Sequence, residues 1–430
     1  MLLGWGCCSI CGVTVTDAHG AIDAVWRIES ARIIAGVARI VRDVGLAEEL
    51  AQDALVAALE QWPESGVPNN PGAWLMAIAK RRAIDLIRRK ETYQRKLAEM
   101  GRQLEIDGDS VEDDVEEILG ETIEDDLLRL VFTACHPVLT TDARVTLTLR
   151  LLGGLKTDEI ARAFLAPEAT IGQRIVRAKR NLAKAEVQFE VPTGDDLIDR
   201  LSSVLEVIYL IYNEGYSATA GDDWMRPSLC NEAIRLGRLL AELMPSEPEV
   251  HGLLALMELQ ASRANARVGP GGEPVLLLDQ DRRRWDRLLI RRGLESIDRA
   301  WALEGAPGPY LLQAAIAACH ARAAEADDTD WARIAGLYAV LAQVVPSPVV
   351  ELNQAVAISM AFGPERGLVA VDALLDEPSL KDYHLLPSVR GDLLFKLGRL
   401  DEAREEFERA AGLTRNERER ALLLDRAAAC

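Results

Sequence analysis

The sequence is poor in aromatic residues, in cysteine and in long apolar runs. Only 5% of the 430 residues are aromatic, whereas 49% are hydrophobic and 27% are charged. This composition favours helices over strands. No segment approaches the roughly 20 apolar residues that a membrane-spanning helix needs. We therefore expect an all-α protein that does not bind a membrane, and its length indicates more than one domain.

Cysteine is too scattered for a disulfide framework. The seven residues are Cys7, Cys8, Cys11, Cys135, Cys230, Cys319 and Cys430. An odd, unclustered set is typical of a reducing compartment, so we expect a cytoplasmic protein. Cys8 and Cys11 form one CxxC motif, but a zinc site needs two further ligands. We therefore expect no metal and no cofactor, and we interpret residues 1–20 as a disordered tail or as the result of too early a start codon.

Signatures of enzymes are also missing. The sequence has no phosphate-binding GxxxxGK[ST] loop, no HExxH, no GxSxG and no dinucleotide fingerprint, and its five histidines do not cluster. We do not expect an enzyme. The net charge of −19 by itself argues against nucleic-acid binding, but charge is distributed unevenly along the chain. Residues 80–96 hold eight Lys or Arg and two acids, whereas residues 100–126 hold twelve acids and one Arg.

The basic run ends the first helical zone. Leu46, Leu50, Ala54, Ala58 and Trp62 are spaced four apart, which places them on one helix face. Pro63 should stop this helix. A second helix is predicted over 72–90. The acidic segment that follows resists packing and should separate this zone from the next.

The next zone has the pattern of a helix-turn-helix. We expect Thr157 to cap a short helix over 158–164, a turn over 166–169, and a second helix over 170–185. Basic side chains project from the second helix without an acid among them, as suits the DNA major groove. These are Arg174, Arg177, Lys179, Arg180 and Lys184.

Three segments resemble the extracytoplasmic-function sigma factors of the sigma-70 family. Residues 46–54, LAEELAQDA, and 71–89, PGAWLMAIAKRRAIDLIRR, are similar to region 2. Residues 154–161, GLKTDEIA, and 168–179, EATIGQRIVRAK, are similar to region 4. The resemblance implies a subunit that binds core RNA polymerase and promoter DNA. Gly172 departs from the family, which often has a basic or polar residue there.

The resemblance also implies three sets of site residues. Polymerase should be bound by Glu48, Glu49, Gln52 and Asp53. The minus-ten promoter element should be bound by Asn70, Trp74, Lys80, Arg81, Arg82 and Arg88. The minus-thirty-five element should be bound by Lys156, Thr170, Gln173, Arg174, Arg177, Lys179 and Arg180.

About 240 further residues follow, in which short helical segments are separated by prolines. Helices are expected over 228–244, 249–264, 282–303, 310–324, 331–344, 349–361, 383–397 and 401–413. Pairs of such helices predict a tetratricopeptide-like solenoid, and the alternative is an irregular helical bundle. The clearest repeat has Gly398, Leu400, Ala403, Phe407 and Ala410. Three short segments, 132–137, 213–216 and 308–317, resemble the sigma-factor group that carries such an extension. That resemblance implies control of the sigma factor by its own C-terminal extension, through a bound protein or ligand.

Five domains or segments are therefore expected: a tail (1–20), region 2 (21–97), an acidic linker (98–126), region 4 (127–187) and the helical extension (192–430). Two alternatives remain for the whole chain, a helix-turn-helix regulator with a ligand- or partner-sensing helical domain, and a scaffold with a vestigial DNA-binding part. Two further features each allow a functional and a purely structural interpretation. Trp224, residues 279–282 and residues 285–287 form either a groove or helix caps around packed tryptophans, and we favour caps. Residues 135–137, Cys-His-Pro, are interpreted as a turn.

Overall fold

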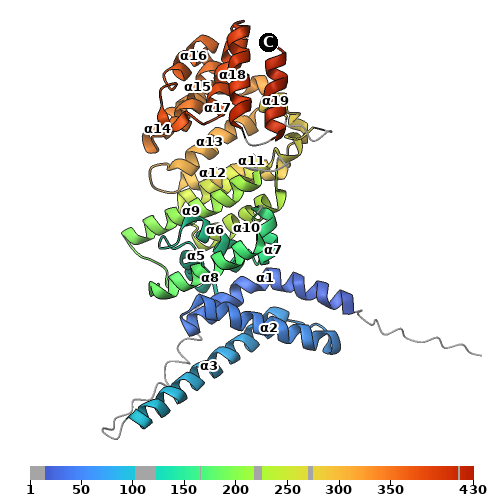
Figure 1. The fold of residues 1–430 in the computed structure, drawn as a ribbon, viewed down its shortest axis with the longest axis vertical. Coiled ribbons are helices and arrows are strands. Elements are labelled where there is room, and N and C mark those ends of the chain that lie inside the picture. The colour runs from blue at the N-terminus through green and yellow to red at the C-terminus, as the bar shows by residue number, and fades with distance from the viewer. Residues whose placement is uncertain (1–14, 102–122, 165, 217–224, 270–274, 415–416) are drawn as a thin grey trace, which may run out of the picture. The chain divides into compact units, whose positions relative to one another are not determined.

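The computed structural model describes residues 15–101, 123–164, 166–216, 225–269, 275–414 and 417–430. Every regular element in these ranges is a helix, which confirms the all-α prediction (Figure 1). The chain packs into two compact units, Met1–Val207 and Ile208–Cys430. None of the described helices combines the length and the apolarity that crossing a membrane requires.

The first helical group consists of α1 (Val15–Val41), α2 (Val44–Ser65) and α3 (Pro71–Gly101). The predicted apolar face of α2 is buried at Leu50, Ala54, Ala58 and Trp62 and packs against the other two helices. Pro63 does not stop α2, which ends at Ser65, and α3 continues past the predicted end to Gly101. Residues 15–20 lie in α1, and residues 1–14 with the CxxC motif lie outside the described residues.

The second helical group consists of α5 (Ile123–Ala134), α6 (Thr141–Leu151), α7 (Thr157–Ala163) and α8 (Glu168–Lys184). Helices α7 and α8 form the predicted helix-turn-helix around the buried Ile160, Ile171 and Ile175. Two details of the prediction are wrong. Helix α8 begins at Glu168, within the predicted turn. The N-cap of α7 is Lys156 rather than Thr157, and the Lys156 N–H donates to the Glu159 carboxylate at 2.8 Å.

Most of the expected acidic linker, residues 102–122, lies outside the described residues. Its last residues belong to α5. There Asp126 is buried with a carboxylate oxygen 3.1 Å from Arg129 and the other 3.5 Å from Arg39 of α1. A buried carboxylate is stable only when it is paired, so the end of the acidic segment is part of the folded unit.

Helix α9 (Asp195–Tyr216) begins in the first unit and ends in the second. The second unit continues with α10 (Pro227–Leu243), α11 (Pro248–Ala261), α12 (Arg287–Ala302), α13 (Pro309–Arg322), α14 (Trp331–Val344), α15 (Pro348–Phe362), α16 (Pro364–Asp372), α17 (Leu385–Lys396), α18 (Leu400–Leu413) and α19 (Glu417–Ala428). Neighbours along the chain pack on one another, as in α14 with α15 and α17 with α18. Sequence reasoning predicted these helices except α9, α16 and α19.

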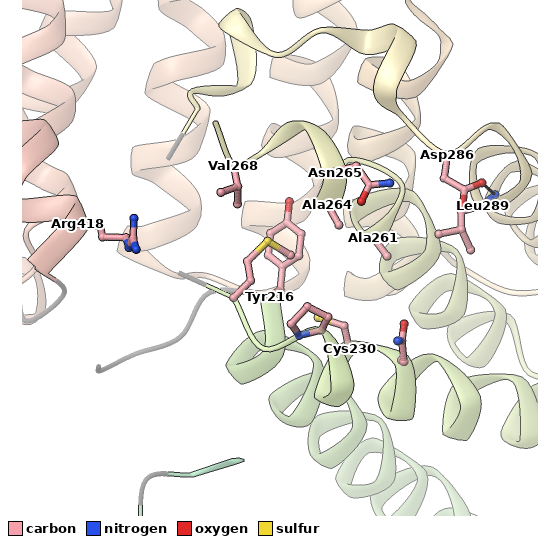
Figure 2. Close-up of a pocket in the computed structure, with 12 residues that line it drawn as sticks. Tyr216, Cys230, Ala261, Ala264, Asn265, Val268, Asp286, Leu289 and Arg418 are labelled. Atoms are coloured by element: carbon pink, nitrogen blue, oxygen red, sulfur yellow. Dashed lines mark hydrogen bonds between the residues drawn. The ribbon is translucent and has the colours of Figure 1, made fainter. Parts of the chain in front are cut away.

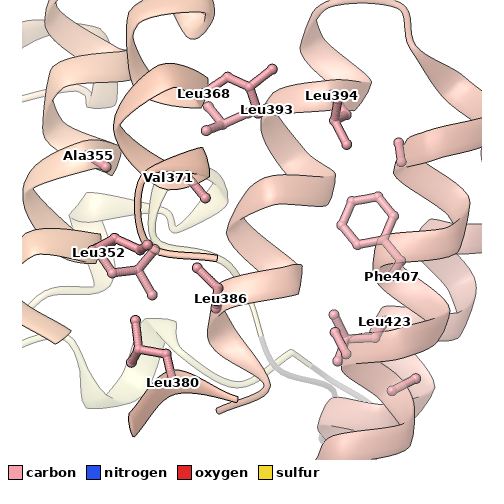
Figure 3. Close-up of a cluster of buried hydrophobic side chains, with 14 of the residues drawn as sticks. Leu352, Ala355, Leu368, Val371, Leu380, Leu386, Leu393, Leu394, Phe407 and Leu423 are labelled. Atoms are coloured by element: carbon pink, nitrogen blue, oxygen red, sulfur yellow. The ribbon is translucent and has the colours of Figure 1, made fainter. Parts of the chain in front are cut away.

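The predicted repeat near the C-terminus has the expected packing. Gly398 has a φ of +75° in the turn between α17 and α18, where a residue without Cβ is favoured. Ala403, Phe407 and Ala410 are fully buried in a core shared by α15 to α19 (Figure 3). Phe407 lies 3.0 Å from where a Cβ on Gly391 would be, so these helices approach closely.

Candidate functional site: a basic helix face, an acidic helix face and a helical cavity

Helix α8 presents one exposed polar face. Gln173, Arg177, Arg180 and Lys184 are spaced four, three and four residues apart and are all exposed. The opposite face is buried through Ile171, Ile175, Ala178 and Leu182. This face offers one amide and three cations to a ligand. Glu168, at the start of α8, is the only acid in the helix, so no carboxylate of α8 lies among these cations. Thr170 is also exposed, at the start of the helix.

The other predicted minus-thirty-five residues are paired with acids. Arg174 is 3.2 Å from Asp142 of α6, and its side chain is 30% exposed. Lys179 lies 2.5 Å from Glu48 of α2, and Lys156 lies 3.4 Å from Asp23 of α1. Three residues of this predicted set therefore already contact a carboxylate, although Lys156 is itself exposed.

Helix α3 carries the predicted minus-ten residues. Arg81 and Arg88 are exposed and seven residues apart, so they share a face, whereas Lys80 is half-buried. Trp74 is half-buried and packs edge-on against Trp62 with ring centroids 5.4 Å apart. Arg82 lies 3.1 Å from Asp53. Asn70 has a structural contact as well, since its side-chain oxygen accepts the Ala73 N–H at 3.1 Å.

The predicted polymerase-binding residues of α2 lie on two different faces. Glu49 and Asp53 are exposed, while Gln52 is half-buried and donates to Glu48 at 2.8 Å. The Glu48 side chain is only 4% exposed. Sequence reasoning missed Val56 and Leu59, which are 49% and 37% exposed beside these acids. Hydropathy alone assigns such residues to a core, so no sequence signal identified them.

Helix α9 is bonded to the second helical group. Arg200 donates to the Phe132 carbonyl at 3.1 Å and lies over the Phe132 ring. Ser203 donates to the Cys135 carbonyl at 2.7 Å and accepts from Arg144. Arg144 also donates a hydrogen bond to the Glu206 carboxylate of α9 at 3.0 Å. These bonds satisfy carbonyls at the end of α5 and attach α9 to the helix-turn-helix group.

The Cys-His-Pro segment is part of this attachment. Cys135 is buried 3.3 Å from the Thr148 hydroxyl, and burial raises the pKa of its thiol to about 11. A neutral, buried thiol is a poor metal ligand or nucleophile. Across the described residues, no three His, Cys, Asp or Glu side chains converge on one metal position.

Two other segments singled out in the sequence have packing roles. The Glu249 carboxylate accepts the N–H groups of Tyr310 and Leu311 and so caps α13. A Cβ on Gly252 would lie 2.6 Å from the Leu311 nitrogen, so α11 and α13 approach closely. In the 213–216 segment, Glu214 forms an ion pair with Arg226.

The 279–287 segment caps helices around a packed tryptophan, as in the interpretation we favoured, and Asp286 and Trp285 also line cavities, as in the alternative. Asp286 accepts from Leu288 and Leu289 at the start of α12. Arg282 stacks over the buried Trp285 ring at 4.9 Å. Its guanidinium also donates to the carbonyls of His320 and Ala323 and to the Thr329 hydroxyl. Trp224 lies outside the described residues.

The second unit contains a cavity of about 500 Å³. Figure 2 shows Tyr216 and Cys230 on one wall, Asn265 and Val268 on another, and Asp286 and Leu289 at the start of α12. Arg267 stacks on the Tyr216 ring at 3.6 Å. The lining therefore combines apolar, amide and charged groups, a combination typical of small-molecule sites. Burial raises the pKa of the Cys230 thiol to about 12, so this residue is not a nucleophile.

Comparisons with known proteins cover up to 95% of the chain. Residues 29–92 match the family "Sigma-70 region 2", residues 129–182 match "Sigma-70, region 4", and residues 200–301 match a family of unknown function, DUF6596. An uncharacterized protein of Rhizobium meliloti (strain 1021) is 44% identical over 95% of both chains.

Some of the relatives have functional names. The ECF RNA polymerase sigma factor SigK of Mycobacterium ulcerans (strain Agy99) is 30% identical over 35% of this chain and 78% of its own length. The probable ECF RNA polymerase sigma factor SigI of Mycobacterium tuberculosis (strain CDC 1551 / Oshkosh) is 25% identical over 40% of this chain and 58% of its own length.

Proposed function

Since this chain belongs to the extracytoplasmic-function sigma factors of the sigma-70 family, we propose that it binds core RNA polymerase and directs it to promoters. The observation that carries the proposal is the pair of exposed basic faces, on α3 and α8, in two helical groups of one chain. One face suits the minus-ten element and the other the minus-thirty-five element. The family is not an enzyme family, and the proposed activity is binding.

On α8, the exposed residues divide into two roles. Gln173 lies in the first half of the helix, where the side chains of a recognition helix reach base edges, and Arg177 follows one turn later on the same face. Arg180 and Lys184 lie in the second half and suit phosphate. Arg174 can join them when it leaves Asp142, because an exposed ion pair is worth only about 0–1 kcal/mol.

On α3, Arg81 and Arg88 are the exposed cations for the minus-ten strand, and Trp74 is held against Trp62 as an aromatic platform. Stacking on an aromatic side chain contributes about 1–3 kcal/mol per base. Lys80 and Arg82 add charge beside this face, and Asn70 fixes the start of α3.

On α2, we propose that Glu49, Asp53, Val56 and Leu59 form the polymerase-facing surface. Acids around exposed apolar side chains suit a partner surface with complementary charge. Glu49→Lys combined with Asp53→Lys should reduce affinity for core polymerase at least tenfold at low salt. Glu64→Lys, an exposed position near the end of the same helix, is the matched control. Equal affinities for the double variant and the control would contradict the assignment.

Transcription from a pool of sheared genomic DNA tests the function without a known promoter. Core polymerase and the chain together should give new RNA 5′ ends, and sequencing their upstream DNA should give two common elements. Specific DNA binding by the chain alone, with no new 5′ ends, would instead support a helix-turn-helix regulator that acts without polymerase.

We also propose that the C-terminal extension regulates the sigma factor. Two observations support this, the bonds from α9 to the second helical group and the cavity in the second unit. The extension itself acts on the sigma regions at high effective concentration, because it belongs to the same chain. A shift from 1:99 to 99:1 between two states needs about 5.5 kcal/mol of differential interaction.

Two truncations separate the parts of the extension. Residues 1–190 lack α9, whereas residues 1–207 keep the segment that bonds Phe132, Cys135 and Arg144. If the second unit regulates, both truncations should differ from the full chain in the yield of new 5′ ends. If α9 itself positions the helix-turn-helix group, only the 1–190 fragment should differ. Equal yields from all three chains would refute regulation by the extension.

A further inference from the structure

The second unit contains a smaller cavity of about 200 Å³, lined by residues of α11, α13 and α14 and of the segment before α12. We call it the His320 cavity. Among the described residues, it shares none of its lining with the larger cavity. Leu256, Leu259 and Ile316 form apolar parts of its wall. Since a cavity of about 150 Å³ can hold benzene, this one has room for a six-membered ring with a small polar substituent.

Two buried side chains of this wall have a polar atom without a partner. Trp285 and His320 are 3% and 9% exposed. The Nε1 atom of Trp285 and the Nδ1 atom of His320 form no hydrogen bond with any described residue. Buried polar atoms are rarely left in this state, because each loses its hydration without compensation. Two of them in the lining of one cavity therefore point to a polar ligand.

The charged groups beside the cavity are positive. Arg263 is part of the lining, and its Cζ lies 5.9 Å from the centroid of the Trp285 ring. Arg282 stacks over the same ring at 4.9 Å. No Asp or Glu is among the described residues that line the cavity. Burial, with the charges of Arg263 and Arg282, lowers the pKa of His320 to about 4. The same positive charges should attract an anion and repel a cation.

Arg263 has hydrogen-bond donors for such an anion. Its Nη2 donates to the Tyr216 hydroxyl at 2.6 Å, and a guanidinium has five N–H donors in all. Further N–H groups therefore remain for a ligand. A carboxylate is the best-matched anion, because it can accept two parallel hydrogen bonds from one guanidinium.

We propose that the His320 cavity binds a small organic acid with one ring. Its carboxylate bonds Arg263, and its ring lies against the apolar wall formed by α11 and α13. The acid would be a ligand through which the extension regulates, and that role rests on the proposed function. Binding itself does not, because it is measured on the chain alone.

NMR titration of the full chain with three probes of nearly one shape tests the charge preference. Benzoate is an anion, benzamide is neutral and benzamidinium is a cation. Benzoate should bind with a Kd of about 1 mM or tighter. It should bind at least about fivefold more tightly than benzamide, because hydrogen bonds to a charged group are stronger. Benzamidinium should bind most weakly. Acetate, which has no ring to bury, should bind at least about tenfold more weakly than benzoate.

Variants of the cavity wall test the location. Gln260 lines the cavity, so Gln260→Glu adds a carboxylate there with little change in shape. It should weaken benzoate at least about tenfold, because like charges repel, and should make benzamidinium the tightest probe. Gln343→Glu makes the same change at an exposed position of α14 and should leave every affinity unchanged. Arg263→Gln should remove the preference for benzoate over benzamide. Urea unfolding shows that each variant is folded, and Arg263→Gln suffices if Gln260→Glu is not.

The outcomes separate this proposal from the proposed function. Absence of saturable benzoate binding, or equal affinities for benzoate and benzamidinium, overturns the proposal. Benzoate binding that folded Gln260→Glu and Arg263→Gln leave unchanged lies outside the His320 cavity and also overturns it. None of these measurements needs polymerase or promoter. A chain that binds benzoate as expected but gives no transcription starts therefore overturns the proposed function and leaves the ligand site standing.

Discussion

Replacing His320 should remove a pH-dependent loss of stability from the second unit. The imidazole is 9% exposed, packs edge-on against Trp331 at 5.1 Å and lines a cavity of about 200 Å³ beside Trp285 and Tyr338. Burial, with the positive charges of Arg263 and Arg282, lowers its pKa to about 4. The native state therefore holds this side chain neutral.

The sign and size of the effect follow from the two pKa values. In the unfolded chain the pKa is about 6.5, so between about pH 6.5 and 4 the unfolded state binds more protons and stability falls as pH falls. At about 1.36 kcal/mol per pKa unit, the loss reaches about 3 kcal/mol below pH 4. At pH 5.0, where the native imidazole is still mostly neutral, the loss is about 2 kcal/mol.

Urea unfolding at pH 7.5 and pH 5.0 measures this difference. Between these pH values the wild-type chain should lose about 2 kcal/mol more unfolding free energy than His320→Gln or His320→Phe. The Phe variant keeps a ring against Trp331, so agreement between the two variants separates titration from packing. The reasoning is refuted if both variants lose as much stability as the wild type.

Three other predictions concern α8 and α9. Arg177→Ala should relax the sequence preference of holoenzyme at the minus-thirty-five element by about 1–3 kcal/mol, whereas Lys184→Ala should weaken all sequences alike and lower the salt slope by about one; selection from random duplexes at two salt concentrations measures both. Gly172→Ala should stabilise α8 by up to about 1 kcal/mol, because an added Cβ meets only Thr157 at 4.0 Å, and thermal unfolding checks this. Ser203→Ala leaves the Cys135 carbonyl without its 2.7 Å donor and should cost about 1–3 kcal/mol, seen as faster hydrogen exchange in the first half of α9.

Sequence periodicity was sufficient for most helices because their buried positions recur at the helical spacing. Leu50, Ala54, Ala58 and Trp62 of α2 are buried as predicted, and so are Ala403, Phe407 and Ala410 of α18. Helix α9 has the same kind of signal, with Leu201, Leu205 and Ile208 buried, and it could have been predicted. The helix boundaries were less accurate, since Pro63 is accommodated within the last turn of α2.

The sequence could not show which charged side chains are exposed and which form ion pairs, because the ion pairs join residues that are far apart in the sequence. Glu48 and Glu49 are neighbours in the sequence, yet one is buried against Arg150 and Lys179 while the other is exposed. Nothing local distinguishes Lys179 from Arg180 either.

An acidic chain can bind DNA when its positive and negative charges are separated by more than the screening length. At physiological salt the Debye length is about 8 Å. A DNA phosphate next to α8 would therefore be attracted by Arg177 and Arg180 and would be little affected by the net charge of −19. These two arginines are exposed and have no ion-pair partner among the described residues, whereas Lys156 and Lys179 contact acids of the first helical group. DNA would therefore meet the two arginines first. It would gain the paired lysines only in exchange for their contacts with Asp23 and Glu48.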